Sequence, residues 1–157
     1  MLTCFVDAAY ANDPQKRQST TGYAIMMAGG AVAYRSKTQT VLALSSTEAE
    51  FFAAVGAAKV ILFLRSVLKE LRIEMKEPTL IYEDNEATIK VVNAAHPTER
   101  VQHIDTPWFC LQSWRERNLV HMKHIAGILN PVDASSKPLG WVLHSRHCQR
   151  MMGHYKN

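Results

Sequence analysis

The chain has 157 residues, of which 47% are hydrophobic and 20% charged, a balance typical of one globular domain and not of a disordered or fibrous chain. Its formal net charge of +4 and its pI of about 9.1 suit a polyanionic partner such as a nucleic acid. Three widely spaced cysteines fit neither a disulfide framework nor a zinc pattern, and the longest apolar run (51–58) is too short to cross a membrane, so we expect an intracellular, cytoplasmic protein without a membrane partner.

The first part of the chain predicts three strands joined by short turns. Apolar and polar residues alternate over residues 2–7, which is the period of a strand. The polar stretch at 11–19 is typical of a turn, and a second strand follows at 20–28. Gly29–Gly30 is a hairpin signal that leads into a third strand at 31–37. Together these features predict a three-strand meander.

A long helix and a shorter strand–helix unit come next. Leucine and isoleucine recur at helical spacing within residues 46–71, which predicts a helix there. Residues 79–82 are expected to form a short apolar strand. The helix predicted after it covers Asn85–Ala94, and His96–Pro97 ends that helix.

The C-terminal part predicts further helices and one more strand. Thr106 is expected to be the N-cap, and Pro107 the first residue, of a helix that runs to about residue 117. Residues 118–124 form the last predicted strand, and Asn130–Pro131 opens a short helix. A His- and Arg-rich tail at 139–157 follows, for which a helix is one option. This order predicts an α/β fold whose sheet has an antiparallel and a parallel portion joined by crossover helices.

Asp7 and Asp84 each come at the end of a predicted strand. In an open α/β sheet, ligands bind in the crevice beyond the strand ends, so two acids placed there can share a metal ion. The alternative is structural, because each acid can instead start a turn or cap the next helix, and a helix does follow Asp84 at once. One strand end alone does not decide between these interpretations.

Glu48 and Glu50 both lie near the start of the long predicted helix. Since they are two residues apart, they point about 200° apart, and only one of them faces the sheet. Ser45 with Glu48 fits a capping box, which gives Glu48 a structural role and leaves Glu50 for the site. The competing capping box pairs Thr47 with Glu50. We favour Glu50 as the site acid, because small residues at helical spacing from it let that side of the helix lie close to a sheet.

Asp133 comes at the start of the predicted short helix, where the helix dipole favours an acid in any case. The four acids carry more weight together, since two unit charges about 4 Å apart repel by about 4 kcal/mol at an effective dielectric constant of about 20. A cluster of all four therefore needs cations or raised pKa values. Hard oxygen ligands select Mg²⁺ or Mn²⁺, and two such ions stabilise the attacking and leaving oxygens of a phosphoryl displacement.

These residues resemble the ribonuclease H domains of copia-type long-terminal-repeat retrotransposons. The likeness runs in order over about residues 2–140, and the run Ser-Ser-Thr-Glu-Ala-Glu at 45–50 is its most specific part. The matching stretches are 6–13 (VDAAYAND), 17–23 (RQSTTGY), 43–51 (ALSSTEAEF), 82–85 (YEDN), 103–105 (HID) and 132–139 (VDASSKPL).

The resemblance implies a ribonuclease H-like fold, with a five-stranded mixed sheet (a three-strand antiparallel meander plus two parallel strands) and helices on both faces. It implies an endoribonuclease that cleaves the RNA strand of RNA/DNA hybrids during reverse transcription, leaving a 3′-hydroxyl and a 5′-phosphate. The four acids match the family's ligands for two Mg²⁺ ions, for which Mn²⁺ can substitute. By this resemblance Asp7 bridges both ions and Asp133 is a weaker ligand. Glu50 and Asp84 complete the shell of one ion each.

The chain departs from the family pattern in three places. Ala9 and Tyr10 stand where the family often has Asp and Trp, with little effect expected on the metals. His124 is the nearest candidate for the mobile-loop histidine that helps product leave in cellular relatives, although it also fits a strand-end residue without a catalytic role. Residues 94–103 are too short for the basic protrusion that some relatives use to bind hybrid, so affinity must come from elsewhere.

Substrate contacts are expected around the acids, because RNA/DNA hybrid is recognised through its shape, phosphates and 2′-hydroxyls. Backbone N–H groups at a helix start suit a phosphate. The alternative for each candidate is a helix cap or a solvated surface group. The candidates are Ser45, Ser46 and Thr47 at the helix start, Asn85 and Glu86 after the fourth strand, and the basic residues Arg17, Arg35 and Lys37.

In the family this domain follows a reverse transcriptase in a larger polyprotein and works inside virus-like particles. We therefore expect a reverse transcriptase domain as a partner, and we place the ribonuclease H domain at 1–138, before the tail. The main alternative function is a catalytically inactive ribonuclease H-like module that binds hybrid or protein, although the retained acids argue against it. Integrases and transposases usually carry Glu on a late helix where this chain has Asp133, and a 3′–5′ exonuclease would act without regard to hybrid.

Overall fold

The first three strands form an antiparallel meander in the computed structural model, which describes residues 1–94 and 105–153. Strand β1 covers Thr3–Ala9, β2 covers Thr20–Met27 and β3 covers Gly30–Thr38. β1 pairs antiparallel with β2, and β2 pairs antiparallel with β3. The turn between β2 and β3 is Ala28–Gly29, whose φ angles of 51° and 92° are those of a type I′ hairpin. The turn thus lies one residue earlier than the Gly29–Gly30 signal indicated.

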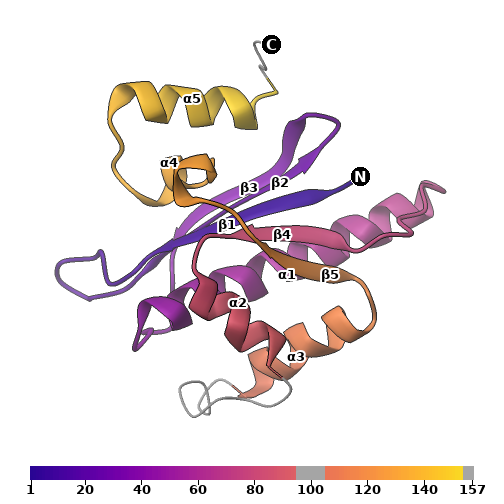
Figure 1. Cartoon of the computed structure of the whole chain (residues 1–157), viewed down its shortest axis with the longest axis horizontal. Helices are drawn as coiled ribbons and strands as arrows, with labels where there is room; N and C mark the ends of the chain where they lie inside the picture. The colour runs from indigo at the N-terminus through magenta and orange to yellow at the C-terminus, as the bar shows by residue number, and fades with distance from the viewer. Residues whose placement is uncertain (95–104, 154–157) are drawn as a thin grey trace.

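Two parallel strands extend the sheet beyond β1. Strand β4 covers Thr79–Glu83 and β5 covers Val120–His124. β4 pairs parallel with both β1 and β5, so the strand order is β3-β2-β1-β4-β5. This order confirms the predicted mixed sheet and makes β1 its central strand (Figure 1).

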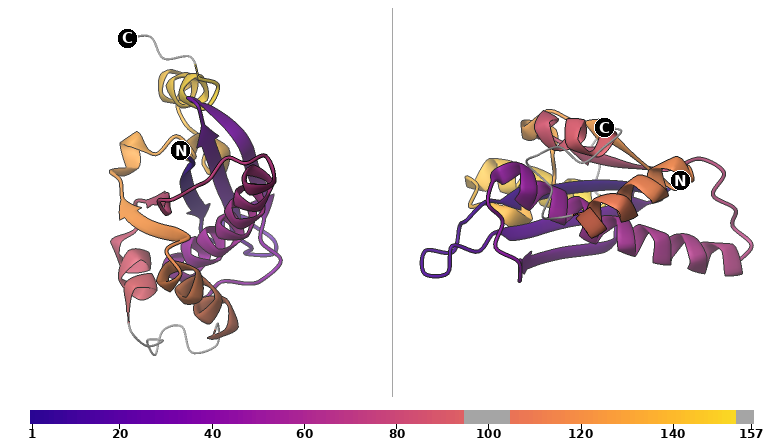
Figure 2. Two further views of the ribbon diagram at one scale, coloured as in Figure 1. Left: turned by 90° about the vertical axis from the view of Figure 1, so that its right-hand side faces the viewer. Right: turned by 90° about the horizontal axis from the view of Figure 1, so that it is seen from below.

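Three helices cover one face of the sheet. Helix α1 (Ser46–Glu70) packs on β1 and β2, and α2 (Glu86–Asn93) and α3 (Asp105–Glu116) pack beside it (Figure 1 and Figure 2). The main core lies between these helices and the sheet, and Phe51 and Ile61 of α1 are fully buried in it. This packing fixes the position of α1 against the sheet.

The C-terminal segments cover the opposite face. After β5 come a short 3₁₀ helix, η2 (Gly127–Leu129), then α4 (Asp133–Ser136) and α5 (Trp141–Met151). α4 packs on β1, β2 and β3, and α5 packs on α4 and β3. The guanidinium carbon of Arg150 in α5 lies 4.9 Å from the centre of the Phe5 ring. Helices therefore cover both faces, as predicted, and the tail contributes one of them.

Several further boundaries differ from the predictions. β1 runs on to Ala9, so Asp7 lies inside the strand and not at its end. β5 begins at Val120 and not at residue 118, and the short helix α4 begins at Asp133 and not at Asn130–Pro131.

Two other differences concern α3 and β4. Helix α3 begins at Asp105, so Thr106 and Pro107 lie inside its first turn. Proline fits there because the N–H groups of a first helical turn have no partner within the helix. β4 runs one residue further than predicted and includes Glu83, which bears on the site described below. The predicted break at His96–Pro97 lies outside the described residues, as does most of the short segment 94–103.

By length and composition alone, helix α1 is long and apolar enough to cross a membrane. The uninterrupted apolar run at 51–58, on which the expectation from the sequence rested, is too short to span a membrane. In the fold, Ala49, Phe51 and Ile61 of this helix are buried against the sheet. The main core of the domain thus accounts for the apolar character of α1.

Candidate active site

Three carboxylates from three separate elements meet beside the central strands. Single ligand oxygens of Asp7 on β1, Glu50 on α1 and Asp84 directly after β4 all lie within 4.8 Å of one another. Strand register explains two of the three, because the parallel pairing of β1 with β4 ends at Phe5↔Tyr82. Two residues beyond this pair come Asp7, still on β1, and Asp84, directly after the end of β4, so both follow the same side of the sheet. We call this cluster of Asp7, Glu50 and Asp84 the open side of the site.

Helix α1 delivers Glu50 to the cluster because its N-terminus is capped in register. Ser45 Oγ accepts the backbone N–H of Glu48 at 3.1 Å, and the Glu48 carboxylate accepts the backbone N–H of Leu44 at 2.7 Å. Glu48 therefore serves the helix start, as the capping-box interpretation predicted. Glu50, on another side of the helix, reaches the strand ends.

Glu83, the last residue of β4, is an acid beside the cluster that the sequence analysis did not single out. It is 0% exposed, its Oε1 accepts the backbone N–H of Asn85 at 2.9 Å, and its Oε2 has no hydrogen-bond partner among the described residues. Its side chain faces the α1 layer, because Ile81, on the same side of β4, belongs to the main core. The missed signal was the position directly before Asp84, where the predicted strand ended one residue too early.

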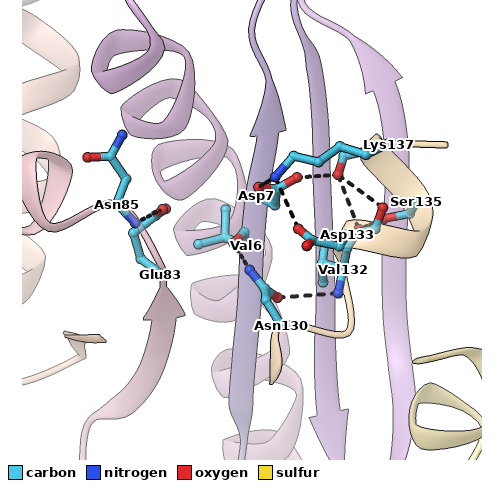
Figure 3. Close-up of polar contacts among 10 residues, drawn as sticks. Val6, Asp7, Glu83, Asn85, Asn130, Val132, Asp133, Ser135 and Lys137 are labelled. Atoms are coloured by element: carbon cyan, nitrogen blue, oxygen red, sulfur yellow. Dashed lines mark hydrogen bonds and ion pairs between the residues drawn. The ribbon is translucent and has the colours of Figure 1, made fainter. Parts of the chain in front are cut away.

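On its other side, Asp7 contacts residues of helix α4 and the lysine that follows it (Figure 3). Lys137 Nζ lies 2.7 Å from Asp7 Oδ1 and 3.1 Å from Asp133 Oδ1. Ser136 Oγ donates to the other Asp7 oxygen. Asp133 is thus bound to the ammonium and does not belong to the three-carboxylate cluster. We call this group of Asp7, Asp133, Ser136 and Lys137 the α4 side.

Neither Ser136 nor Lys137 was singled out from the sequence. Both belong to the Asp-Ala-Ser-Ser-Lys run that carries part of the family resemblance. Lys137 also stands four residues after Asp133, which is the spacing of an ion pair on a helix. This spacing is the signal in the sequence that points to Lys137 as a partner of Asp133.

Asn130 fixes the α4 side to the sheet. It is fully buried, its Nδ2 donates to the backbone carbonyl of Val6 at 2.9 Å, and its Oδ1 accepts the backbone N–H of Val132 at 3.3 Å. These bonds join the start of α4 to the residue directly before Asp7, as Figure 3 shows. The sequence pattern indicated for Asn130 only a place at the start of a helix, and not this link to β1.

Two glycines let the chain pass close to the acids. Gly22 pairs with Asp7 across β1 and β2, and a Cβ added there would lie 2.7 Å from Val132 Cγ1. A Cβ added to Gly127 of η2 would lie 2.8 Å from Asp84 Oδ2. Both contacts are shorter than any that real Cβ atoms make, so a larger residue at either place requires a shift.

Burial and mutual repulsion raise the pKa values of the acids that face α1. Burial comes first, followed by the charges of Glu83 and Asp7, and together they raise the pKa of Glu50 to about 10. Burial also raises the pKa of Glu83 well above its usual value, although the hydrogen bond from Asn85 acts in the opposite direction. Both groups therefore favour a proton or a cation beside them.

The α4 side supplies its own cation. Burial and the charge of Asp7 raise the pKa of Asp133, while the hydrogen bond and charge of Lys137 lower it. Burial lowers the pKa of Lys137, but its hydrogen bonds and charge interactions with Asp7 and Asp133 outweigh burial and raise it. The ammonium therefore stays charged between two carboxylates.

The comparisons with known proteins agree with this geometry. The chain is 32% identical over 137 residues to the Retrovirus-related Pol polyprotein from transposon TNT 1-94 of Nicotiana tabacum, a match that covers 87% of this chain and 10% of that protein. It is 28% identical over 142 residues to the corresponding polyprotein of transposon RE2 of Arabidopsis thaliana, which covers 90% of this chain and 10% of that protein. The chain thus spans about a tenth of the length of these curated relatives. No family model matches it.

Solved structures share the fold. RNase H1 from the halophilic archaeon Halobacterium salinarum superposes with a TM-score of 0.62 at 15% identity, over 86% of this chain and 93% of that one. The chain has a ribonuclease H-like fold and is similar in sequence to part of retrotransposon Pol polyproteins. LC11-RNase H1 in complex with RNA/DNA hybrid gives a TM-score of 0.61 at 11% identity, over 83% of this chain and 88% of that one.

The open side of this ribonuclease H-like fold fits a hard divalent cation. Its donors are all carboxylate oxygens, which Mg²⁺ and Mn²⁺ prefer. Glu50 is 5% exposed, and its Oε2 has no hydrogen-bond partner among the described residues, so a cation would satisfy it. The three oxygens lie within 4.8 Å of one another, close to the span of about 4.2 Å between opposite ligands of one ion with bonds of about 2.1 Å.

Two of the contact residues predicted at helix starts, Ser45 and Asn85, cap those helices. Ser45 caps α1, and Asn85 caps α2, where its Oδ1 accepts two backbone N–H groups at 2.9 and 3.2 Å. Ser46 is exposed and Thr47 half-buried in the first turn of α1, and Glu86 is exposed in the first turn of α2. The helix-cap alternative is thus what the structure shows for Ser45 and Asn85.

The three basic residues predicted to meet the substrate do not form one cluster. Arg35 and Lys37 on β3 are exposed and line one groove, together with Tyr23 of β2 and Phe52 of α1. Arg17 is exposed in the loop between β1 and β2, with a positive φ of 54°. Because β3 is two strands from β1, the backbone that carries Arg35 and Lys37 lies about 10 Å from the strand that carries Asp7.

His124 is the last residue of β5 and is exposed. It pairs with Glu83 in the register of β4 and β5, so it stands on a strand and not on a loop. It lies outside the cluster of three carboxylates. The strand-end alternative describes its position.

Proposed function

We propose that this ribonuclease H domain hydrolyses the RNA strand of RNA/DNA hybrids with the help of divalent cations, Mg²⁺ in the first place. The observation that carries the proposal is the meeting of Asp7, Glu50 and Asp84, which come from three elements far apart in the sequence. Bringing like charges together under burial costs stability, so the fold alone gives no reason for such a cluster. Acids with strongly perturbed pKa values in one place are typical of a functional site.

The protein's own part in this reaction is to hold its carboxylates ready for the ions. Register between β1 and β4 keeps Asp7 beside Asp84, and the capped start of α1 keeps Glu50 opposite them. Divalent ions held by these carboxylates would supply positive charge to the attacking and leaving oxygens at the phosphorus atom. Asp133 joins as a weaker ligand, since it shares the Lys137 ammonium with Asp7.

Two observations support hybrid as the substrate. The structural neighbour LC11-RNase H1 was solved in complex with an RNA/DNA hybrid. The chain carries a net charge of +4, and its groove lined by Arg35 and Lys37 offers two cations to a phosphate backbone. We assign this groove to the sugar–phosphate backbone, and we assign the exposed Ser46, four residues before Glu50 on α1, to the strand that is cut.

The partner in this proposal is a reverse transcriptase domain of the same polyprotein. The relatives are Pol polyproteins of which the chain spans about a tenth, so the domain is proposed to work as one part of a longer protein. A long hybrid held by a neighbouring domain would also make up for the modest basic surface of this one.

Cleavage of labelled substrates tests the proposal. With Mg²⁺ present we expect the RNA strand of a hybrid to be shortened, while duplex RNA and single-stranded RNA stay intact, and EDTA should stop the reaction. The Asp7→Asn variant is the matched control, because it keeps the shape of the side chain and removes the charge. Hybrid binding without cleavage by the wild-type chain, at any Mg²⁺ or Mn²⁺ concentration, would favour the inactive binding module instead.

A further inference from the structure

The Lys137 ammonium occupies the space between Asp7 and Asp133. Its Nζ lies 2.7 Å from Asp7 Oδ1 and 3.1 Å from Asp133 Oδ1, so it bonds one oxygen of each carboxylate. The Asp7 side chain is 0% exposed and that of Asp133 is 13% exposed. This pair of bonds is therefore largely shielded from water, where charge-assisted hydrogen bonds are strong.

The surrounding structure holds Lys137 in this place. Its backbone N–H donates to the carbonyl of Asp133 at 3.0 Å, which closes the single turn of α4. Gly22 lets that turn lie directly on the sheet beside Asp7, and Asn130 ties its start to β1. The lysine is thus aimed at Asp7 by the fold and is not a solvated surface group.

The open side has no comparable cation. Among the described residues, no lysine, arginine or histidine forms an ion pair with Glu50 or Asp84. Glu50 Oε2 is also without a hydrogen-bond partner there. Asp7 belongs to both sides, so the two sides are neighbours. On the α4 side a lysine lies between two carboxylates, whereas Glu50 and Asp84 on the open side have no ion pair among the described residues.

We propose that Lys137 is the resident cation of the α4 side, and that a divalent ion must displace its ammonium to bind Asp7 and Asp133 together. A divalent ion on the open side meets the ammonium only at the shared Asp7, because Lys137 forms no ion pair with Glu50 or Asp84. This inference rests on the proposed function and refines it, because two ions then bind with unequal affinity and Lys137 sets the difference. The lysine acts on metal loading and is not assigned a chemical step.

Competition follows from the atoms involved. The ammonium uses Oδ1 of both aspartates, and a divalent ion would take those oxygens at about 2.1 Å. Two cations in contact with the same pair of oxygens repel each other. The Lys137 side chain is 36% exposed, so it has a route into solvent when it is displaced.

Binding of Mn²⁺ to the full chain without nucleic acid tests the inference, followed by electron paramagnetic resonance of the free ion and by calorimetry. The wild-type chain is expected to show a tight and a weak class of sites. Lys137→Met keeps the length of the side chain and removes the charge, and should tighten the weak class by about tenfold. Lys137→Arg keeps the charge and should leave the two classes unequal. Lys90→Met removes an exposed charge from the pair with Glu86 and should change neither class.

A weak class in Lys137→Met that is unchanged or weaker than in wild type overturns the inference. One Mn²⁺ per chain in both proteins overturns it as well, whereas one in wild type and two in the variant supports it. Thermal unfolding provides a check on folding, because Lys137→Met should melt lower than wild type in EDTA and gain more from Mn²⁺. These readouts do not depend on cleavage, so a chain that fails the hybrid assay but shows the tightening refutes only the proposed function.

Discussion

The open side and the α4 side of the acid cluster share Asp7 but are built in different ways. On the open side, strand register and a helix cap bring carboxylates together and leave Glu50 Oε2 without a hydrogen bond among the described residues. On the α4 side, Ser136 and Lys137 satisfy both oxygens of Asp7. An unsatisfied buried carboxylate lowers the stability of the fold until a cation binds it, whereas a satisfied one adds to stability. One small site thus combines a part that needs a ligand with a part that the protein completes by itself.

The largest effect is expected from Asp7→Asn, because this acid belongs to both sides. Loss of the shared ligand should slow cleavage of hybrid by at least about 1000-fold. Hybrid binding should stay close to wild type, since the change removes a metal ligand and not a contact to the nucleic acid. Cleavage and equilibrium binding measured on the same labelled hybrid check this, and wild-type rates would contradict the site assignment.

The next effect separates the two glutamates of α1. Glu50→Gln should slow cleavage by about 100-fold, because it removes a ligand from the open side. Glu48→Gln should leave cleavage within a few-fold of wild type, yet it weakens a bond to the helix start by about 1 kcal/mol, or about 2–4 °C in Tm. Cleavage rates and melting curves of both variants give the comparison. If Glu48→Gln were the slower enzyme, the assignment of the two acids would be reversed.

The open side also predicts how stability depends on pH without metal. The folded chain holds a proton on Glu50 up to a pKa of about 10, whereas the unfolded chain releases it near 4.5. The folded state therefore binds more protons between these values, and stability falls as pH rises through that window. In EDTA, Tm should decline between about pH 5 and pH 9, and Glu50→Gln should show a shallower decline and a higher Tm at about pH 8. Parallel curves for the two proteins would argue against this account.

The α4 side depends on the close approach at Gly22, so Gly22→Ala should move α4 away from Asp7. The Cβ would meet Val132 Cγ1 at 2.7 Å, and overpacking of this kind costs about 1–3 kcal/mol. We expect a fall of about 2–4 °C in Tm for each kcal/mol. Gly56→Ala in α1 is the control, since a Cβ there meets nothing and favours the helix. Equal melting temperatures for Gly22→Ala and wild type would show that α4 adapts without cost.

The smallest effect is expected in the groove lined by Arg35 and Lys37, which contains none of the acids. Removing Arg35 and Lys37 together should weaken hybrid binding several-fold and lower the salt dependence of binding by about one unit for each lost phosphate contact. The turnover rate should not change, because neither residue belongs to the acid cluster. Lys59→Ala, an exposed charge on α1, is the matched control. Unaltered affinity and salt dependence would remove the groove from the substrate path.

The parts of the site that the sequence predicted are those with local causes. The capping pattern at Ser45 and Glu48 is a matter of four consecutive residues, so it separated Glu50 from Glu48 before any fold was known. The strand-end argument predicted that Asp7 and Asp84 lie close together, which they do, although β1 runs two residues beyond Asp7. Glu83 was missed for an equally local reason, since a strand boundary wrong by one residue hid it.

The alternating pattern, the caps and the family resemblance determined the element order, the mixed sheet and the acids to watch. Only the tertiary structure decided which carboxylate has which partner. Asp7 and Lys137 are 130 positions apart, and their contact exists because Gly22 has no side chain and Asn130 bonds to Val6. Periodicity records which face of an element is buried, but it holds no information on which distant side chain arrives there. That choice comes from packing, which depends on the whole chain at once.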